Sequence, residues 1–185
     1  MDLASWLWNE LRDLFETDDG SLPEVWVAYV DPVATVAGYA LLRRRAARFV
    51  SENAWFWSKV HDAERPVDSV LNASALVVSG EAEAFHVVFG GIRSRNSIIP
   101  DLGVSVLPDQ LALDYRMGPE WGPSELEALF GLLDDLLALD LGATLSLEDG
   151  VPADAAARFQ NAWRRWACCA SAPRGKRSAR QARGS

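Results

Sequence analysis

The segment GVSVLPDQLALDYRMGPEWGPSELEALFGLLDDLLALDLGATLSLEDG, residues 103–150, decides the fold of this chain. Val104 and Val106 would share one face of a short strand. Residues 111–116 alternate large apolar with smaller or polar side chains, which is typical of a strand with one buried face. The turn residues 108–110 between the two strands favour an antiparallel hairpin. The segment therefore begins with two paired strands.

A corner rich in Gly, Pro and Trp follows at residues 118–123 and cannot continue a strand. Ser124 occupies the position of an N-cap, and Glu127 completes the pattern of a capping box. The helix predicted over residues 124–139 has one apolar stripe, made by Leu126, Leu129, Phe130, Leu133, Leu136 and Leu137. Burial of each contributes about 1.5–3 kcal/mol before entropy, so this helix is a principal core element. Residues 143–147 predict a returning strand.

Two more amphipathic helices are predicted before this segment. Asp2 can cap a helix over residues 3–15, and Asp31-Pro32 is a typical start of a second helix. The predicted buried stripe of the second helix is Val33, Val36, Ala37, Ala40 and Leu41. Its end carries four arginines, Arg43, Arg44, Arg45 and Arg48. We interpret these arginines as cations that stabilise the negative end of the helix dipole. The alternative interpretation is that they bind phosphate.

The remaining elements are mostly strands. In the strand predicted over residues 24–30, residues 25–30 are apolar on both alternating faces, which predicts a central strand covered on both sides. Three further strand candidates are residues 54–58, 74–79 and 84–92. Loops are predicted at residues 61–66 and 93–96. A last helix begins at Val151-Pro152.

This order of elements specifies an α+β fold, with a mostly antiparallel sheet of about five to six strands packed by three to four amphipathic helices. The chain has 185 residues, of which 49% are apolar, and this is enough for one core. Residues 1–170 are predicted to form a single domain. Residues 171–185 contain no large apolar residue and predict a disordered basic tail.

The formal net charge of −8 hides an asymmetry, because five of the 18 basic side chains lie in the last fifteen residues, which contain no acid. Residues 1–170 therefore carry 13 basic and 26 acidic side chains, a net charge of −13. Such a field disfavours nucleic acid and anionic membranes as partners, and it accelerates association with a basic protein. An ordinary solubilising surface charge is the alternative explanation.

The cysteine content indicates a reducing compartment. Cys168 and Cys169 are the only cysteines, and neighbours in sequence rarely pair with each other. The sequence shows no signal-peptide pattern, and its apolar stretch at residues 33–42 is too short to span a bilayer. We therefore expect a cytoplasmic protein that does not contact a membrane.

No set of residues predicts catalysis, a metal site or a cofactor. His61 beside Asp62 could act as a base with its orienting acid, and His86 as its partner or as a metal ligand. Two histidines without matching Cys or carboxylate spacing do not make a zinc signature. His61 is interpreted as a surface loop residue and His86 as a half-buried strand residue with a hydrogen-bond partner. Gly90-Gly91 lacks the phosphate-loop pattern.

Three features together resemble bacterial immunity proteins of polymorphic toxin systems. They are the small, acidic, Trp-rich α+β chain, the Asp18-Asp19-Gly20 sequence after a polar first helix, and the block LDYRMGPEW at residues 113–121 that leads into residues 124–139. The resemblance is one of layout and covers roughly residues 1–167. It implies a non-enzymatic protein that neutralises a toxin, often a basic nuclease, by covering its active site. It carries no catalytic residue over to this chain.

The first hypothesis is therefore a binding protein with a cognate protein partner, possibly a basic toxin domain. Its predicted contact surface consists of Glu120, Trp121, Glu125, Glu127, Asp134 and Asp135. The alternative is a small ligand-binding domain or enzyme with a pocket near Trp55, Trp57, His61 and Arg95. A structural subunit of a larger assembly is a third possibility, which an exposed apolar face would favour.

Overall fold

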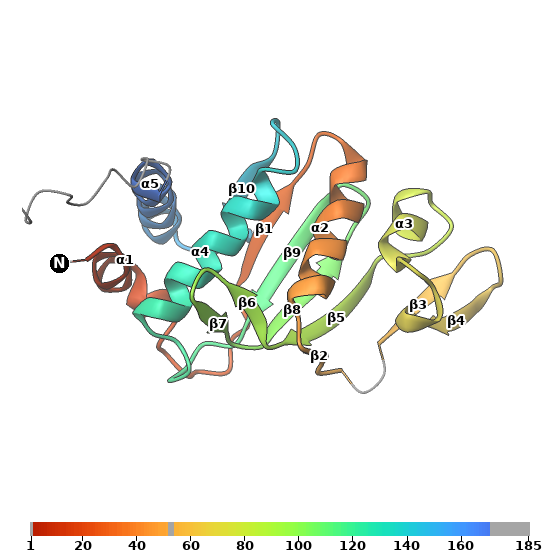
Figure 1. Ribbon diagram of the computed structural model, residues 1–185, viewed down its shortest axis with the longest axis horizontal. Coiled ribbons are helices and arrows are strands. Elements are labelled where there is room, and N and C mark those ends of the chain that lie inside the picture. Colours follow the sequence, from red (N-terminus) through yellow and green to blue (C-terminus); the bar gives the residue numbers. More distant parts are fainter. Residues whose placement is uncertain (1, 52–53, 171–185) are drawn as a thin grey trace, which may run out of the picture.

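The computed structural model describes residues 2–51 and 54–170, and its centre is a six-stranded antiparallel sheet (Figure 1). The strands lie in the order β10 (Thr144–Leu147), β1 (Glu24–Ala28), β9 (Gln110–Tyr115), β8 (Leu102–Val106), β5 (Phe85–Gly90) and β2 (Arg48–Phe49). Two small hairpins pair β3 (Trp55–Ser58) with β4 (Ala63–Pro66) and β6 (Ile92–Ser94) with β7 (Ser97–Ile99). The prediction of an α+β fold with a mostly antiparallel sheet is confirmed.

Helices cover one face of this sheet. The described α-helices are α1 (Leu3–Leu11), α2 (Pro32–Arg45), α3 (Ala73–Val78), α4 (Pro123–Leu137) and α5 (Ala153–Ala170). Short 3₁₀ turns are η1 (Arg12–Leu14) and η2 (Val67–Ser69). Figure 1 shows α2 and α4 in front of the strands, with α1 and α5 beside α4. The helices thus form one layer against the sheet and continue past its β10 edge.

The core lies between α2, α4 and the covered face of the sheet. Val25, Leu113, Val104 and Val87 are register partners across β1, β9, β8 and β5, and all four are fully buried. The apolar stripe of α4 packs on this face, with Leu126, Leu129, Leu133 and Leu136 fully buried. The prediction that this helix is a principal core element is confirmed.

A second group of aromatic rings holds α5 against α4. Phe130 of α4 is fully buried, and its ring centroid lies 5.5 Å from Phe159, 5.5 Å from Trp163 and 5.7 Å from Trp166. At the other side of α5, Arg158 binds Asp13 through both guanidinium nitrogens, at 3.1 and 2.6 Å. These hydrogen bonds lower the pKa of the Asp13 carboxyl. The last helix is therefore fixed to both α4 and η1.

The predicted starts of two helices are confirmed by their hydrogen bonds. The side chain of Asp2 accepts from Ser5 N at 2.8 Å, and that of Asp31 accepts from Val33 N at 2.9 Å. The predicted start of α4 is wrong, because its N-cap is Gly122 with Pro123 at the first helical position and no side-chain cap. Proline suits that position because a helix leaves its first N–H groups unbonded.

Other local predictions are also wrong. Residues 74–78 belong to helix α3 rather than to a strand, and Ser79 is the C-cap of that helix. Asn72 caps its start by accepting from Ser74 N at 3.1 Å. The loop predicted at residues 61–66 contains β4, and the loop at residues 93–96 is the tip of the β6–β7 hairpin. In each case the pairing or cap involves few residues, so the periodic signal is short.

Two predicted faces differ from the observed ones. Helix α2 does not bury the predicted stripe, since Val33 is 64% exposed. Its buried residues are Ala34, Thr35, Gly38, Tyr39, Leu41 and Leu42. Strand β1 is buried on one face only, because Trp26 and Ala28 remain partly exposed. The predicted tail, residues 171–185, lies outside the described residues.

We expect Phe130→Ala to destabilise the protein by about 3–5 kcal/mol, because the change removes a buried ring and leaves a cavity between α4 and α5. Equilibrium unfolding in urea, followed by far-ultraviolet circular dichroism, measures this loss. Leu141→Ala is the matched control, since Leu141 is fully exposed. Equal unfolding midpoints for the two variants would contradict the packing of α5 described above.

Candidate functional site

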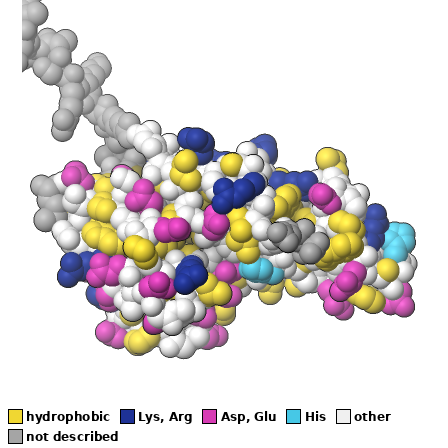
Figure 2. Space-filling view, turned by 90° about the horizontal axis from the view of Figure 1, so that it is seen from below, with side chains coloured by type: hydrophobic (Ala, Val, Ile, Leu, Met, Phe, Trp, Pro, Cys, Tyr) yellow, Lys and Arg dark blue, Asp and Glu magenta, His cyan; other side chains and the backbone are white. Residues whose placement is uncertain are grey.

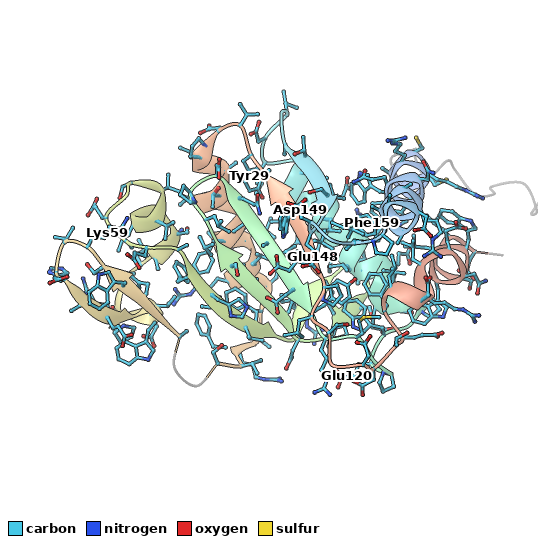
Figure 3. The ribbon with its side chains drawn as sticks, turned by 180° about the vertical axis from the view of Figure 1, so that it is seen from behind. Tyr29, Lys59, Glu120, Glu148, Asp149 and Phe159 are labelled. Carbon is cyan, nitrogen blue, oxygen red and sulfur yellow. The ribbon has the colours of Figure 1, made fainter. Side chains whose placement is uncertain are left out.

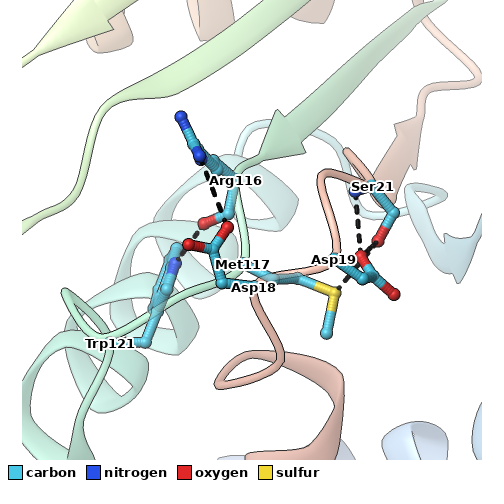
Figure 4. A network of polar contacts seen from close by, with 6 residues as sticks. All are labelled: Asp18, Asp19, Ser21, Arg116, Met117 and Trp121. Atoms are coloured by element: carbon cyan, nitrogen blue, oxygen red, sulfur yellow. Dashed lines mark hydrogen bonds and ion pairs between the residues drawn. The ribbon is translucent and has the colours of Figure 1, made fainter.

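The structure places the predicted contact residues in several different environments. Trp121 is 5% exposed and packs against Phe15 and Tyr115, with ring centroids 4.9 and 5.3 Å away. Its Nε1 donates to the carbonyl of Arg116 at 2.8 Å, as Figure 4 shows. Trp121 is therefore a core residue. Glu120 beside it is exposed.

The acids of α4 are largely occupied by contacts within the protein. Asp134 lies 3.0 Å from Arg95, and Asp135 lies 2.7 Å from Arg45. Glu125 accepts a hydrogen bond from Ser97 at 3.0 Å. The Arg95 side chain crosses α4 at Gly131, where a Cβ atom would overlap it. The predicted acidic edge of α4 is thus mostly neutralised or bonded within the fold.

Basic and acidic side chains are unevenly distributed on the surface. Figure 2 shows several Lys and Arg side chains close together along the upper edge of the view from below, whereas Asp and Glu spread over its left and lower parts. Acidic surface is therefore not confined to α4.

The alternative pocket is not assembled by this fold. Arg95 lies at the β6–β7 turn, with its guanidinium 5.6 Å from the Trp166 ring and bonded to Asp134. Trp55 and Trp57 instead lie on β3, far along the molecule, and are 43% and 39% exposed. A cavity of about 370 Å³ beside Trp55 is lined by Phe49, Ser51, Ala54, Trp55, Pro66, Val67 and Asp68. We therefore drop the four-residue pocket.

The loop 17–21 and the corner 116–121, which contributed to the resemblance, lie side by side. Arg116 reaches Asp18 at 3.4 Å, and Ser21 Oγ donates to Asp19 at 2.5 Å and contacts Met117 Sδ at 3.3 Å (Figure 4). The backbone N–H of Gly118 donates to the Phe15 carbonyl at 2.8 Å. These contacts close one end of the sheet and build a corner.

The second face of the sheet has no helix over its centre among the described residues. Figure 3, seen from behind, shows β1, β9, β8 and β5 in front of α2. Because side chains alternate along a strand, this face carries the residues that are not in the core. One ladder across it joins Trp26, Ala112, Ser105 and His86. We call this surface the open face.

Three carboxylates from three neighbouring strands form a row on the open face. Glu24 of β1 and Asp114 of β9 are direct register partners. Glu148 follows β10, and its N–H donates to the Glu24 carbonyl at 3.1 Å. We call Glu148, Glu24 and Asp114 the acidic row. Like charges directly opposite each other in a sheet repel, so the pairing of Glu24 with Asp114 costs the sheet some stability.

Each carboxylate of the acidic row has a hydrogen-bond partner, and Glu148 Oε1 accepts from the backbone N–H of Glu24 at 3.3 Å. Trp26 Nε1 donates to Glu24 Oε2 at 2.6 Å, and His86 Nε2 lies 2.7 Å from Asp114 Oδ2. The second contact crosses β8 at Gly103, where a Cβ atom would overlap the Asp114 carboxylate. The expectation that His86 is a strand residue with a hydrogen-bond partner is confirmed.

The contact with Asp114 also shifts the titration of His86. The hydrogen bond to Asp114 raises the pKa of His86 above 6.5, partial burial opposes this, and the charges of Asp114 and Glu24 add to the rise. His86 thus offsets part of the charge of Asp114 near neutral pH. Among the described residues, no Lys or Arg forms an ion pair with any member of the acidic row.

Two shallow hollows border the acidic row, one on the open face beside Glu24 and one at the end of the sheet beside Glu148, η1 and the segment before α5. One, of about 610 Å³, is bordered by Glu24, Trp26, His86, Ser105, Gln110 and Ala112. The other, of about 460 Å³, is bordered by Asp13, Leu22, Tyr115, Met117, Glu148 and Asp149. The strand register explains the first hollow, because Ala112 and Ser105 are small and lie between the larger Trp26 and His86.

His86 and Asp114 are the paired histidine and carboxylate of the open face. His86 and Asp114 form a dyad, and Ser105 is the register partner of His86, but among the described residues no hydrogen bond joins Ser105 to His86. Within residues 2–51 and 54–170, no three His, Cys, Asp or Glu side chains are placed to share a metal ion. No helix in the same residues has the length and apolarity needed to cross a membrane.

Comparisons of this chain with models of protein families, with curated proteins and with solved structures find no match.

We expect Asp114→Asn and Gly103→Ala each to lower the pKa of His86, because the first removes the charge and the second displaces the carboxylate. A ¹H–¹³C NMR titration measures this, with the resonance of His61 as a second signal in each spectrum. Ser146→Ala is the control, since Ser146 is exposed on β10. An unchanged pKa in both variants would show that Asp114 does not hold His86.

The raised pKa of His86 also makes the free energy of unfolding depend on pH. The folded chain binds the His86 proton more tightly than the unfolded chain, so protonation of His86 stabilises the fold. This contribution to the free energy of unfolding is fully present below pH 6.5. It is lost as the pH rises through the higher folded pKa. We expect this part of the pH dependence to be smaller in Asp114→Asn than in the wild type. Urea titrations of both proteins from pH 5 to pH 9 measure it, because this range extends about two units to either side of the ordinary histidine pKa.

Proposed function

We propose that this chain is a non-enzymatic binding protein, an immunity protein that neutralises a cognate toxin by direct contact with a basic surface of that toxin. The observation that carries the proposal is the acidic row on the open face. It consists of three carboxylates on adjacent strands that no Lys or Arg of the described residues pairs.

The shape of the open face supports this proposal. Antiparallel sheets that are covered on one side commonly leave the other side to solvent, which provides a broad and rigid platform. Here the platform has a partly exposed Trp26 and one shallow hollow beside Glu24. Aromatic residues with surrounding polar groups are typical of the energetically important centre of a protein interface.

The charge of the chain supports a basic partner. Residues 1–170 have a net charge of −13, and a field of one sign accelerates encounter with a partner of the opposite sign. The proposed contact surface is therefore moved from α4 to the open face, because Asp134 and Asp135 already bind Arg95 and Arg45. Glu120 and Glu127 stay outside the proposed surface.

The direct test uses growth, because toxins and their immunity proteins are usually encoded side by side. The product of the neighbouring gene is expressed in a bacterial host, alone and together with this chain. An immunity protein restores growth that the neighbouring product arrests, and the two proteins co-purify as a stoichiometric complex. Growth arrest that this chain does not relieve, or a neighbouring product that causes no arrest, counts against the immunity function.

We expect the double variant Glu24→Gln/Glu148→Gln to slow association with the partner about 10-fold at low salt, because steering depends on the charge of the contact surface. The variant should be at least as stable as the wild type, since it removes like-charge repulsion and the new amide oxygen at position 24 can still accept from Trp26. Association rates are measured by stopped-flow fluorescence at several salt concentrations.

Glu120→Gln is the matched control for this prediction, because it removes one charge from an exposed position that Figure 3 shows well apart from Glu148. Equal slowing in the control and the double variant would place the electrostatic steering in the whole molecule rather than in the acidic row.

A further inference from the structure

We propose that the hollow beside Trp26 receives one arginine side chain of the partner, with its guanidinium on the face of the Trp26 ring and next to the carboxylate of Glu24, whose register partner is Asp114. This inference rests on the proposed function for the identity of the partner, but the site itself consists only of residues of this chain. The hollow measures about 610 Å³.

The strand register gives the hollow its shape. Across β1, β9, β8 and β5 the ladder runs Trp26, Ala112, Ser105, His86, so two small residues separate two large ones. The small residues form a floor, and Trp26 and His86 form opposite walls. The hollow therefore has the Trp26 ring at one end and the His86 ring at the other.

Glu24 borders the hollow, and its register partner Asp114 lies next to it. Glu24 and Asp114 are register partners and lie two residues along the strands from Trp26 and Ala112, on the same face. The Trp26 indole holds Glu24 at 2.6 Å, and His86 holds Asp114 at 2.7 Å, so both acceptors are oriented before a ligand arrives. Groups that are held in place in advance lose less conformational entropy on binding.

The charges determine the kind of ligand. Two carboxylates face each other, His86 offsets only one of them, and within the described chain no Lys or Arg compensates the other. A cation is therefore the complementary charge. Guanidinium suits this site better than ammonium because it is planar, stacks on aromatic rings and donates several hydrogen bonds to carboxylates at once.

The first test uses a short probe and the full chain. The peptide acetyl-Gly-Arg-Gly-amide is titrated into the protein, and NMR follows the Trp26 indole N–H and the His86 ring. We expect saturable shifts of both signals. A peptide with citrulline in place of arginine, which has nearly the same shape without the charge, should produce at least 5-fold weaker binding, in line with a charge-assisted contact.

Variants of the two carboxylates then test where the arginine peptide binds. Glu24→Gln and Asp114→Asn should each weaken peptide binding at least 3-fold, a loss within the range of single ion pairs, whereas Glu120→Gln should leave it unchanged. The first two substitutions are nearly isosteric, and circular dichroism confirms that the variants are folded. Equal binding of the citrulline peptide, or equal binding by all three variants, overturns the arginine site.

The outcomes separate this inference from the proposed function. If the partner binds and is neutralised but arginine peptides do not bind at Trp26, the arginine site is wrong and the immunity function stands. If arginine peptides bind at Trp26 but the neighbouring gene product is neither toxic nor bound, the site stands and the immunity function is wrong.

Discussion

One-sided burial of an antiparallel sheet is the constraint on which the rest of this structure depends. Val25, Leu113, Val104 and Val87 lie side by side beneath α2 and α4, and each is fully buried. A slip of one residue in any of these strands would turn its apolar side chains to solvent, so the core fixes the register. The same register places Glu24 opposite Asp114 on the other face. The acidic row is thus a consequence of how the core packs.

Much of this fold could be predicted because its strongest signals are local. The hairpin of β8 and β9 follows from alternation around a turn, and α4 follows from a long apolar stripe. Asp2 and Asp31 mark helix starts through contacts with residues two or three positions away. The sequence analysis was wrong where the signal is short or divided. The six residues of α3 contain two valines that suggest a strand, although the Asn72 cap makes them a helix.

The candidate site was harder to predict, because it depends on contacts between distant segments. Trp121 and Trp26 are both tryptophans close to acids in the sequence, yet one packs against Phe15 in the core and the other borders a hollow on the open face. Nothing local distinguishes them. Similarly, Asp134 and Asp135 form a clear acidic pair on the helix, but Arg95 and Arg45 reach them from elements that lie far away in the sequence.

The arrangement around Asp114 argues that the open face is maintained for more than stability. Position 103 is a glycine in the middle of a sheet, where glycine weakens a strand. The space that a side chain would fill there is occupied by the Asp114 carboxylate, which His86 binds. A larger apolar residue at 103 with an uncharged residue at 114 would strengthen the same ladder and remove the repulsion with Glu24. The chain instead keeps two oriented carboxylates beside a tryptophan on an uncovered surface. Such a combination stabilises the folded chain little by itself, and a positively charged group bound beside it would offset the repulsion between Glu24 and Asp114.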